Sequence, residues 1–197
     1  IESTTIDPDG TLNYKFDVYY EKLGRIQLVD KDGKVLSEVV YKNNLTDASR
    51  ADVTPVPEIP AAYKIKDGQK VFGYDTTAGT VDPNDPADPN AIGRNTTIVV
   101  EQKSVARQET KVVTETIFYK DALTGEVLAP EHKDQVTFHR EVVVNPVTNE
   151  VLSTGEWTAE NADTTFDAVT SPVLEGYTAN PLVVEEVTGL TAESKDV

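Results

Sequence analysis

The chain has 197 residues and a formal net charge of −16, with 34 acidic residues against 18 basic ones. This charge excludes nucleic acid as a partner, because phosphate binding needs clustered Lys and Arg, and it disfavours direct contact with an anionic membrane. Cys is absent, which excludes disulfides and thiolate metal sites. No run approaches the ~20 apolar residues of a membrane span.

The length accommodates one or two domains, since domains most often have about 100–150 residues. Both ends are abrupt, and we expect a segment of a longer protein. Two interpretations of the acidic surface remain open. In the first, the charge keeps tandem copies soluble and makes them repel one another. In the second, it selects cationic partners or divalent metal ions.

The first predicted element is a strand at residues 14–20. Aromatic and β-branched side chains alternate there with polar ones, at Tyr14, Phe16, Val18 and Tyr20. Alternation with period two predicts a strand with one buried face.

A hairpin follows. Residues 26–29 form a short apolar strand, residues 30–33 (Asp-Lys-Asp-Gly) are a turn signal, and residues 34–41 continue as the partner strand. Residues 46–51 are the best candidate for a short helix, with Thr46 or Asp47 as its N-cap.

The rest of the first half is also β-prone. Three prolines at positions 55, 57 and 60 interrupt regular structure. Residues 63–74 return to strands around an Asp-Gly turn, and residues 96–102 are a strong strand. Residues 104–109 are polar and short, as in a domain junction.

The second half repeats the β pattern. Residues 111–119 are a strand, residues 122–126 a turn, residues 147–157 a hairpin partner and residues 181–187 a closing strand. The strand before the hairpin partner has one apolar face, made by Val136, Phe138, Val142 and Val144. Arg140 interrupts that face.

The two halves echo one another. Residues 26–36 parallel residues 117–128, and residues 53–63 parallel residues 169–177. The same order of strand, turn, strand and Pro-bearing loop before a Tyr predicts two related domains, at residues 1–107 and 108–197.

The second half resembles the mucus-binding (Mub) repeats of lactobacillus cell-surface adhesins. The matching positions are Phe138 and Arg140, the turn at 146–149, Trp157-Thr158, residues 166–172 and residues 176–178. Asn149 stands where Gly is usual, a mild change because Asn also tolerates positive φ. Residues 26–101 resemble the mucin-binding (MucBP) module, through the Val-Asp-x-Asp-Gly-x-Val-Leu turn and Ile-Pro-x-x-Tyr. Ala62 replaces the usual Gly before Tyr63.

The resemblance implies a β-dominated α+β fold of two tandem β-grasp, ubiquitin-like domains in an elongated arrangement. It also implies an extracellular, cell-wall-anchored surface protein of a Gram-positive bacterium. Its partners would be mucin glycans or glycoproteins and neighbouring tandem repeats of the same chain. Each repeat would bind weakly, and tandem copies would supply avidity.

Two alternatives remain open at this point. Small β domains with exposed edges can add a partner strand, and host immunoglobulin is a protein partner associated with Mub-type repeats. The other alternative is a structural spacer that holds an active tip away from the cell wall.

The sequence offers few residues suited to catalysis. His132 and His139 are the only histidines, and no Gly-x-Ser-x-Gly context supports a nucleophile. His139 falls on the strand face opposite Phe138, so we expect an exposed surface residue. We therefore predict a protein that is not an enzyme and requires no cofactor.

One candidate metal site lies in the proline-rich loop. Asp82, Asp85 and Asp88 recur at every third position, and carboxylate oxygens are the ligands that Ca²⁺ prefers. The spacing is not that of an EF-hand, and a plain solvated loop is the competing interpretation.

Aromatic residues are the remaining candidates for glycan contacts. Trp157 is the only tryptophan, and its place at a strand end favours core packing over a sugar platform. Tyr63 and Tyr177 occupy matching places in the two halves, which favours a structural role. The sequence leaves the ligand-binding residues undetermined.

Overall fold

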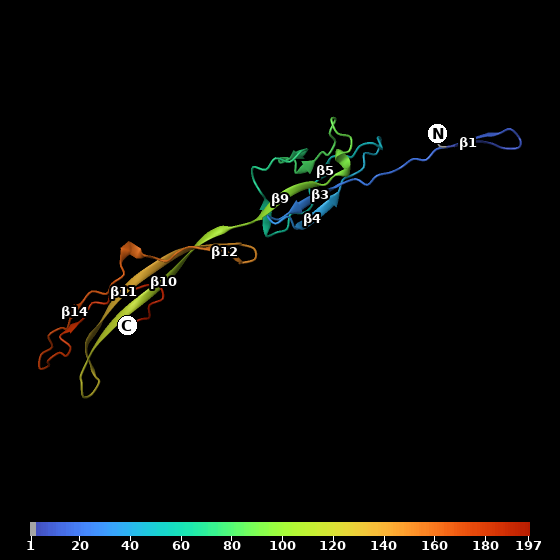
Figure 1. Ribbon diagram of the computed structural model, residues 1–197. Coiled ribbons are helices and arrows are strands. Elements are labelled where there is room, and N and C mark those ends of the chain that lie inside the picture. Colours follow the sequence, from blue (N-terminus) through green and yellow to red (C-terminus); the bar gives the residue numbers. More distant parts are fainter. Residues whose placement is uncertain (1–2) are drawn as a thin grey trace. The chain divides into compact units, whose positions relative to one another are not determined.

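The computed structural model describes residues 3–197. It divides into two compact units, one ending at Gln102 and the other running from Lys103 to Val197 (Figure 1), here called unit 1 and unit 2. The predicted domain boundary between residues 107 and 108 falls inside a strand of unit 2, β10 (Val105–Lys120). The polar residues expected to join two domains therefore belong mostly to that strand.

Both units are built from strands, which confirms the predicted β-dominated class. Residues 3–197 contain no α-helix and only two three-residue 3₁₀ segments, η1 (Ala91–Gly93) and η2 (Glu160–Ala162). The α+β class predicted helices beside the strands, but the described residues have only these two short 3₁₀ turns.

The short helix predicted for residues 46–51 is wrong. Asn44 Oδ1 accepts hydrogen bonds from the backbone amides of Thr46 and Asp47, at 3.0 and 2.9 Å. Asp47 Oδ1 accepts the next one from the Ser49 amide at 2.9 Å. These local bonds satisfy the amides in successive turns, so they compete with helix formation.

The main sheet of unit 1 has four strands in the order β4-β3-β9-β6. These strands are β3 (Arg25–Val29), β4 (Val35–Val40), β6 (Tyr63–Ile65) and β9 (Thr96–Gln102). β3 pairs antiparallel with β4 and parallel with β9, and β6 pairs antiparallel with β9. The strand that ends unit 1 therefore lies between β3 and β6.

The predicted hairpin of residues 26–41 is confirmed. Asp30 Oδ1 accepts hydrogen bonds from the amides of Asp32 and Lys34, at 2.9 and 3.0 Å, and Gly33 adopts a φ of 82°. The turn is thus closed by its own side chain, as its composition predicts. Buried alternate residues of β3 and β9 form the core of unit 1 with others, namely Ile26, Leu28, Tyr41, Ala51, Val81, Ile98 and Val100.

A smaller three-stranded sheet completes this part of unit 1. It has the order β5-β8-β7, formed by β5 (Thr54–Pro55), β7 (Tyr74–Asp75) and β8 (Thr80–Val81). Gly73, just before β7, lies against the backbone of Asp82 and accepts its amide hydrogen bond at 2.9 Å.

The N-terminal strand expected to have a buried face is exposed instead. Its first residues form β2 (Leu12–Lys15), which pairs only with β1 (Ser3–Ile6) (Figure 1). Phe16 and Val18 lie beyond the strand and are 63% and 73% exposed. Alternation marks a strand that can bury one face, but burial requires a second layer, and residues 3–197 of this chain supply none there.

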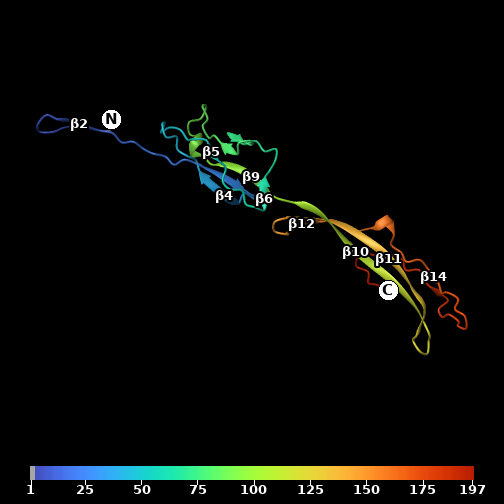
Figure 2. The ribbon, with the colours of Figure 1, turned by 180° about the vertical axis from the view of Figure 1, so that it is seen from behind.

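Unit 2 is dominated by one long antiparallel hairpin, as Figures 1 and 2 show. β10 pairs with β11 (Val127–Val144) from Val105↔Val144 to Lys120↔Val127. The turn between them is the predicted one, with Asp121 Oδ1 accepting from the Leu123 and Thr124 amides at 2.8 and 2.9 Å.

One face of β11 is buried as predicted. Val136, Phe138, Val142 and Val144 are each at most 7% exposed, and Arg140 is half-buried among them. The core of unit 2 joins this face to segments from the C-terminal third. Its buried members are Val113, Val136, Phe138, Phe166, Leu190 and Ala192.

The turn after β11 follows the sequence prediction closely. Asn145 is fully buried, and its Oδ1 accepts from the Val147 amide at 3.0 Å. Asn149 has a φ of 60°, which confirms that Asn can replace Gly at this position. The chain then returns along β11 as β12 (Val151–Thr154) and β13 (Thr158–Ala159).

The predicted closing strand at residues 181–187 is short. Only β15 (Val183–Val184) is a strand there, and it pairs with β14 (Val169–Thr170). Farther along the same pair of segments, Phe166 and Val187 form an isolated antiparallel bridge. The loop at residues 171–182 is therefore held at its base by strand pairing.

Candidate functional site

Two cationic side chains lie over the indole ring of Trp157. The guanidinium carbon of Arg140 is 4.5 Å from the ring centroid, and Lys111 Nζ is 5.3 Å from it. Trp157 is half-buried and packs against the core of unit 2. The pairing of β13 with β11, which begins at Thr158, fixes the ring over this part of the sheet.

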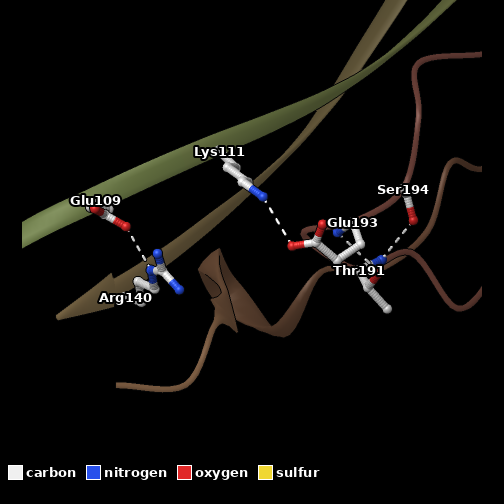
Figure 3. Close-up of polar contacts among 6 residues, drawn as sticks. All are labelled: Glu109, Lys111, Arg140, Thr191, Glu193 and Ser194. Carbon is white, nitrogen blue, oxygen red and sulfur yellow. Dashed lines mark hydrogen bonds and ion pairs between the residues drawn. The ribbon is translucent and has the colours of Figure 1, made fainter. Parts of the chain in front are cut away.

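Both cations also form ion pairs, which Figure 3 shows. Arg140 Nε is 2.6 Å from Glu109 Oε2, and Lys111 Nζ is 3.0 Å from Glu193 Oε1. The Glu193 amide is in turn 3.2 Å from Thr191 Oγ1. Such exposed pairs contribute only about 0–1 kcal/mol each, so their main effect is to position the two cations near the indole.

We predict that Trp157→Ala lowers the stability of unit 2. The substitution removes core contacts and two cation–π contacts, and we expect it to cost about 2–4 kcal/mol in the free energy of unfolding. Thermal unfolding followed by far-UV circular dichroism measures the change. An unchanged melting temperature would contradict this packing role and favour the alternative of a sugar platform.

The two tyrosines at matching positions have different surroundings. Tyr63 is half-buried and packs against the core of unit 1, as expected of a structural residue. Tyr177 is 51% exposed. Near its loop, hydrogen bonds from the Thr124 and Leu123 amides hold the pKa of Asp121 below its ordinary value.

The two histidines lie in β11. His139 is half-buried and not exposed as predicted, with Nδ1 3.0 Å from Thr110 Oγ1 and Nε2 3.8 Å from Glu160 Oε1. His132 is also half-buried and lies opposite Ile117 in the ladder. Both are therefore held in the sheet by strand pairing.

The three aspartates of the proline-rich loop each stabilise a local turn. Asp82 Oδ1 accepts from the Asn84 amide at 3.0 Å, and Asp85 Oδ1 accepts from the Ala87 amide at 2.9 Å. Asp88 pairs with Arg94, and the hydrogen bond from the Arg94 side chain is the largest cause of the lowered pKa of Asp88. Among residues 3–197, no group of three or more His, Asp or Glu side chains gathers to hold a metal ion. Calcium binding here stays a prediction.

A cavity of about 600 Å³ opens in unit 2 beside the tip of the long hairpin. One wall is residues 117–120 of β10, and the other is the loop at residues 171–184. No acidic side chain lines it, although the chain is strongly acidic, and Lys120 is the one charged residue of the lining. This volume falls in the range of about 300–1,000 Å³ that is usual for ligand pockets.

Sequence reasoning did not find this cavity. Ser171-Pro172 and Gly176-Tyr177 carry part of the family resemblance, and both lie in the loop that forms its second wall. Phe118, on the first wall, is 55% exposed despite its place in a predicted strand. Phe118 stands among polar residues on the outward face of that strand, and this placement was the one sequence signal that pointed to the cavity.

Glu115 is a buried acid without a partner. It is 2% exposed, and neither carboxylate oxygen has a hydrogen-bond partner among residues 3–197. It lies in β10 between the core residue Val113 and the cavity residue Ile117. Burying an unpaired carboxylate is unfavourable, so Glu115 weakens the unit that contains it.

We expect Glu115→Met to stabilise unit 2. Removing a buried polar group that lacks a partner should raise the free energy of unfolding by about 1–3 kcal/mol. Chemical denaturation followed by the fluorescence of Trp157 measures unit 2 alone, because unit 1 has no tryptophan. Glu141→Met, at an exposed position of β11, is the matched control. A destabilised Glu115→Met variant would contradict the expectation.

None of the helices in the described residues is long and apolar enough to cross a membrane. A comparison with curated proteins finds no match.

Comparisons with known families and structures identify the fold. Residues 104–197 match the family model of the Muc B2-like domain. The crystal structure of Mub-RV is 24% identical, with a TM-score of 0.58, and the match covers 89% of this chain and 94% of that one. This likeness shows a shared β-dominated fold over most of the chain.

Two further structures are similar. The type 2 repeat of the mucus binding protein MUB from Lactobacillus reuteri is 21% identical, with a TM-score of 0.46, over 89% of this chain and 95% of that one. The mucin-binding domain of Spr1345 from Streptococcus pneumoniae is 30% identical, with a TM-score of 0.40, over 47% of this chain and 87% of that one. The chain described here is a Mub-like repeat, and its residues 104–197 are a Muc B2-like domain.

Proposed function

We propose that this chain is a mucin-binding repeat of a bacterial surface adhesin. The observation that carries the proposal is the Muc B2-like domain at residues 104–197. The repeat would act outside the cell, on a protein anchored to the cell wall. Each copy would bind mucin glycoproteins weakly, and neighbouring copies would raise the effective concentration of sites.

We also infer a β-grasp, ubiquitin-like arrangement for the two units. Unit 1 supports this with the hairpin β3–β4, the parallel pair β3–β9 and the order β4-β3-β9-β6. Unit 2 supports it with a corresponding hairpin, β10–β11. In unit 1 the helix of such a fold is replaced by turns and loops between residues 43 and 62.

Binding of the isolated chain to immobilised mucin tests the proposal. We expect saturable but weak binding that is lost when the mucin is deglycosylated. Retained binding to the deglycosylated ligand would show recognition of protein, and immunoglobulin would then be the partner to test. A chain that binds neither ligand would be a spacer. The assay is run with Ca²⁺ and with a chelator, because calcium binding at Asp82, Asp85 and Asp88 is untested.

We predict that mucin adhesion rises as the pH falls toward ~4, where Asp and Glu begin to neutralise. The chain carries a net charge of −16, and mucins carry sialic acid and sulfate. Acid therefore removes like-charge repulsion, which salt confines to about 8 Å at physiological ionic strength. Adhesion is measured between pH 7 and 4 with circular dichroism as the control for folding. Weaker adhesion by the intact fold at acid pH would contradict this account.

The turns should survive this pH range. The pKa of Asp88 is lowered from 3.8, first by the hydrogen bond from Arg94, and that of Asp121 is lowered from 3.8, first by the bond from the Thr124 amide. A lowered folded-state pKa contributes stability above the unfolded value, and this stability is lost only as the pH falls through the lower folded value. Both turns therefore keep this contribution to a lower pH than a turn closed by an Asp with an ordinary pKa would.

A further inference from the structure

One end of the long hairpin of unit 2 reverses the charge balance of the chain. Residues that lie opposite each other in an antiparallel ladder point to the same face. Glu109 is opposite Arg140, Arg107 is opposite Val142, and Lys111 is opposite Phe138. Between residues 105 and 111 of β10 and residues 138 and 144 of β11, this face therefore carries three basic side chains and one acidic one. The whole chain has 34 acidic and 18 basic residues.

Arg140 is positioned on this face and keeps donors to spare. Its guanidinium carbon is 4.5 Å from the centroid of the Trp157 ring, and its Nε donates to Glu109 Oε2 at 2.6 Å. Among residues 3–197, the terminal nitrogens Nη1 and Nη2 have no hydrogen-bond partner. The indole and Glu109 restrict the guanidinium, so it needs little further ordering to bind a second oxyanion.

Lys111 and Arg107 place two more positive charges beside Arg140. Lys111 Nζ is 5.3 Å from the same ring centroid and 3.0 Å from Glu193 Oε1 (Figure 3). Arg107 is exposed and forms no ion pair within the part of the chain that the structure describes. It is the diagonal neighbour of Arg140 in the ladder, a position with Cα atoms about 7–8 Å apart. A ligand of one or two sugar rings can therefore contact all three cations.

The glutamates that pair with these cations leave the face accessible. The side chain of Glu193 is 78% exposed and that of Glu109 is 47% exposed. Exposed ion pairs contribute little free energy, because water solvates the separated charges well. An anion that contacts more than one of the cations therefore displaces these carboxylates at a small cost.

We propose that the face made by Arg107, Lys111, Arg140 and Trp157 binds an anionic sugar through its sulfate ester or carboxylate. This inference deepens the proposed function and rests on it for the natural ligand. Guanidinium groups bind such oxyanions with paired, charge-assisted hydrogen bonds. The half-buried indole adds an apolar surface for the C–H groups of the sugar ring. An acidic chain thereby meets an acidic mucin glycan at a point of opposite charge.

Titration of the full chain with small sugars at constant ionic strength tests this face. Trp157 is the only tryptophan, so its fluorescence reports binding beside its ring. We expect N-acetylglucosamine 6-sulfate to give a saturable change at millimolar concentration and neutral N-acetylglucosamine to bind at least about tenfold more weakly. N-acetylneuraminic acid is the carboxylate arm, and the tighter of the two acidic sugars identifies the group that is recognised.

The Arg107→Gln/Lys111→Gln chain tests the residues. Both side chains are exposed, so unit 2 should stay folded, which its melting temperature checks. We expect its affinity for the acidic sugar to fall by about tenfold or more, because two charge-assisted contacts are lost. The matched control is Lys31→Gln/Lys133→Gln, which makes the same change in net charge at exposed positions outside this face. It should keep the affinity of the parent chain.

Three results would overturn the proposal. The first is equal binding of the neutral and acidic sugars, and the second is parent affinity in the Arg107→Gln/Lys111→Gln chain. The third is inorganic sulfate that binds as tightly as the sulfated sugar, because the face would then recognise an anion and not a sugar. Adhesion to mucin is measured separately. A parent chain that binds no mucin contradicts the proposed function, whereas mucin binding that the double variant retains in full contradicts only this inference.

Discussion

Phe166→Ala is expected to lower the free energy of unfolding of unit 2 by about 3–5 kcal/mol. Phe166 is fully buried and packs in the core with Phe138 and Leu190. Its backbone also exchanges two hydrogen bonds with Val187, each 2.9 Å long. Truncation leaves a cavity that this rigid bridge prevents from collapsing. Denaturation followed by Trp157 fluorescence reports the loss, because this probe lies in the same unit.

Leu123→Ala is the matched control for Phe166→Ala. Leu123 lies in the turn between β10 and β11 of the same unit and is 97% exposed, so its truncation should change stability by less than about 0.5 kcal/mol. Equal losses in the two variants would show that the core of unit 2 does not lie around Phe166.

Gly73→Ala should destabilise unit 1 by about 3–5 kcal/mol. A Cβ at this position would lie 1.9 Å from the carbonyl oxygen of Asp82, and Gly73 has a φ of 73°. The obstacle is backbone, which is held in place by the Asp82 amide bond to Gly73 O, so it cannot move aside cheaply. Hydrogen exchange of peptides covering β3 and β9 measures the stability of this unit.

Gly79→Ala separates the collision from the backbone strain. Gly79 has a similar φ of 67°, but a Cβ there would meet no heavy atom within 4 Å. This variant should lose only about 1–2 kcal/mol, the cost of placing an L-residue in the left-handed region. If the two variants lose the same stability, strain alone explains the effect at Gly73.

Together the two destabilised variants assign mucin adhesion to a unit. The Muc B2-like match covers residues 104–197, so we expect Phe166→Ala to abolish adhesion above the melting temperature of its unit. Gly73→Ala should retain adhesion at the same temperature. The reverse pattern would place the mucin-binding surface in unit 1.

Turns were the most predictable part of this protein. The Asp30–Gly33 turn, the Asp121 turn and the turn that ends at Asn149 all form as predicted. Their bonds join residues within four positions of each other, and positive φ restricts the residue choice. Such information lies within a few residues of sequence.

The helix predicted at residues 46–51 shows where local reasoning fails. Its capping residues are real hydrogen-bond acceptors, but each one closes a turn. Asn84 from a distant loop then bonds the Ala51 backbone, with Nδ2 2.8 Å from its carbonyl oxygen. A partner 33 positions away fixes the conformation of this segment, and no local pattern reveals that partner.

Motif resemblance was enough to predict the family. The β-dominated class, the long apolar face of β11 and most turns could also be predicted from the sequence, because they depend on periodicity and on short-range bonds. Which apolar residues are covered could be learned only from the folded molecule. Phe138 is buried because segments from residues 157–192 return over it, whereas Phe16 has the same alternating context and stays exposed. A side chain is buried only when a second surface packs over the strand that carries it. The sequence of one strand specifies the apolar face of that strand, but not the segment that covers it.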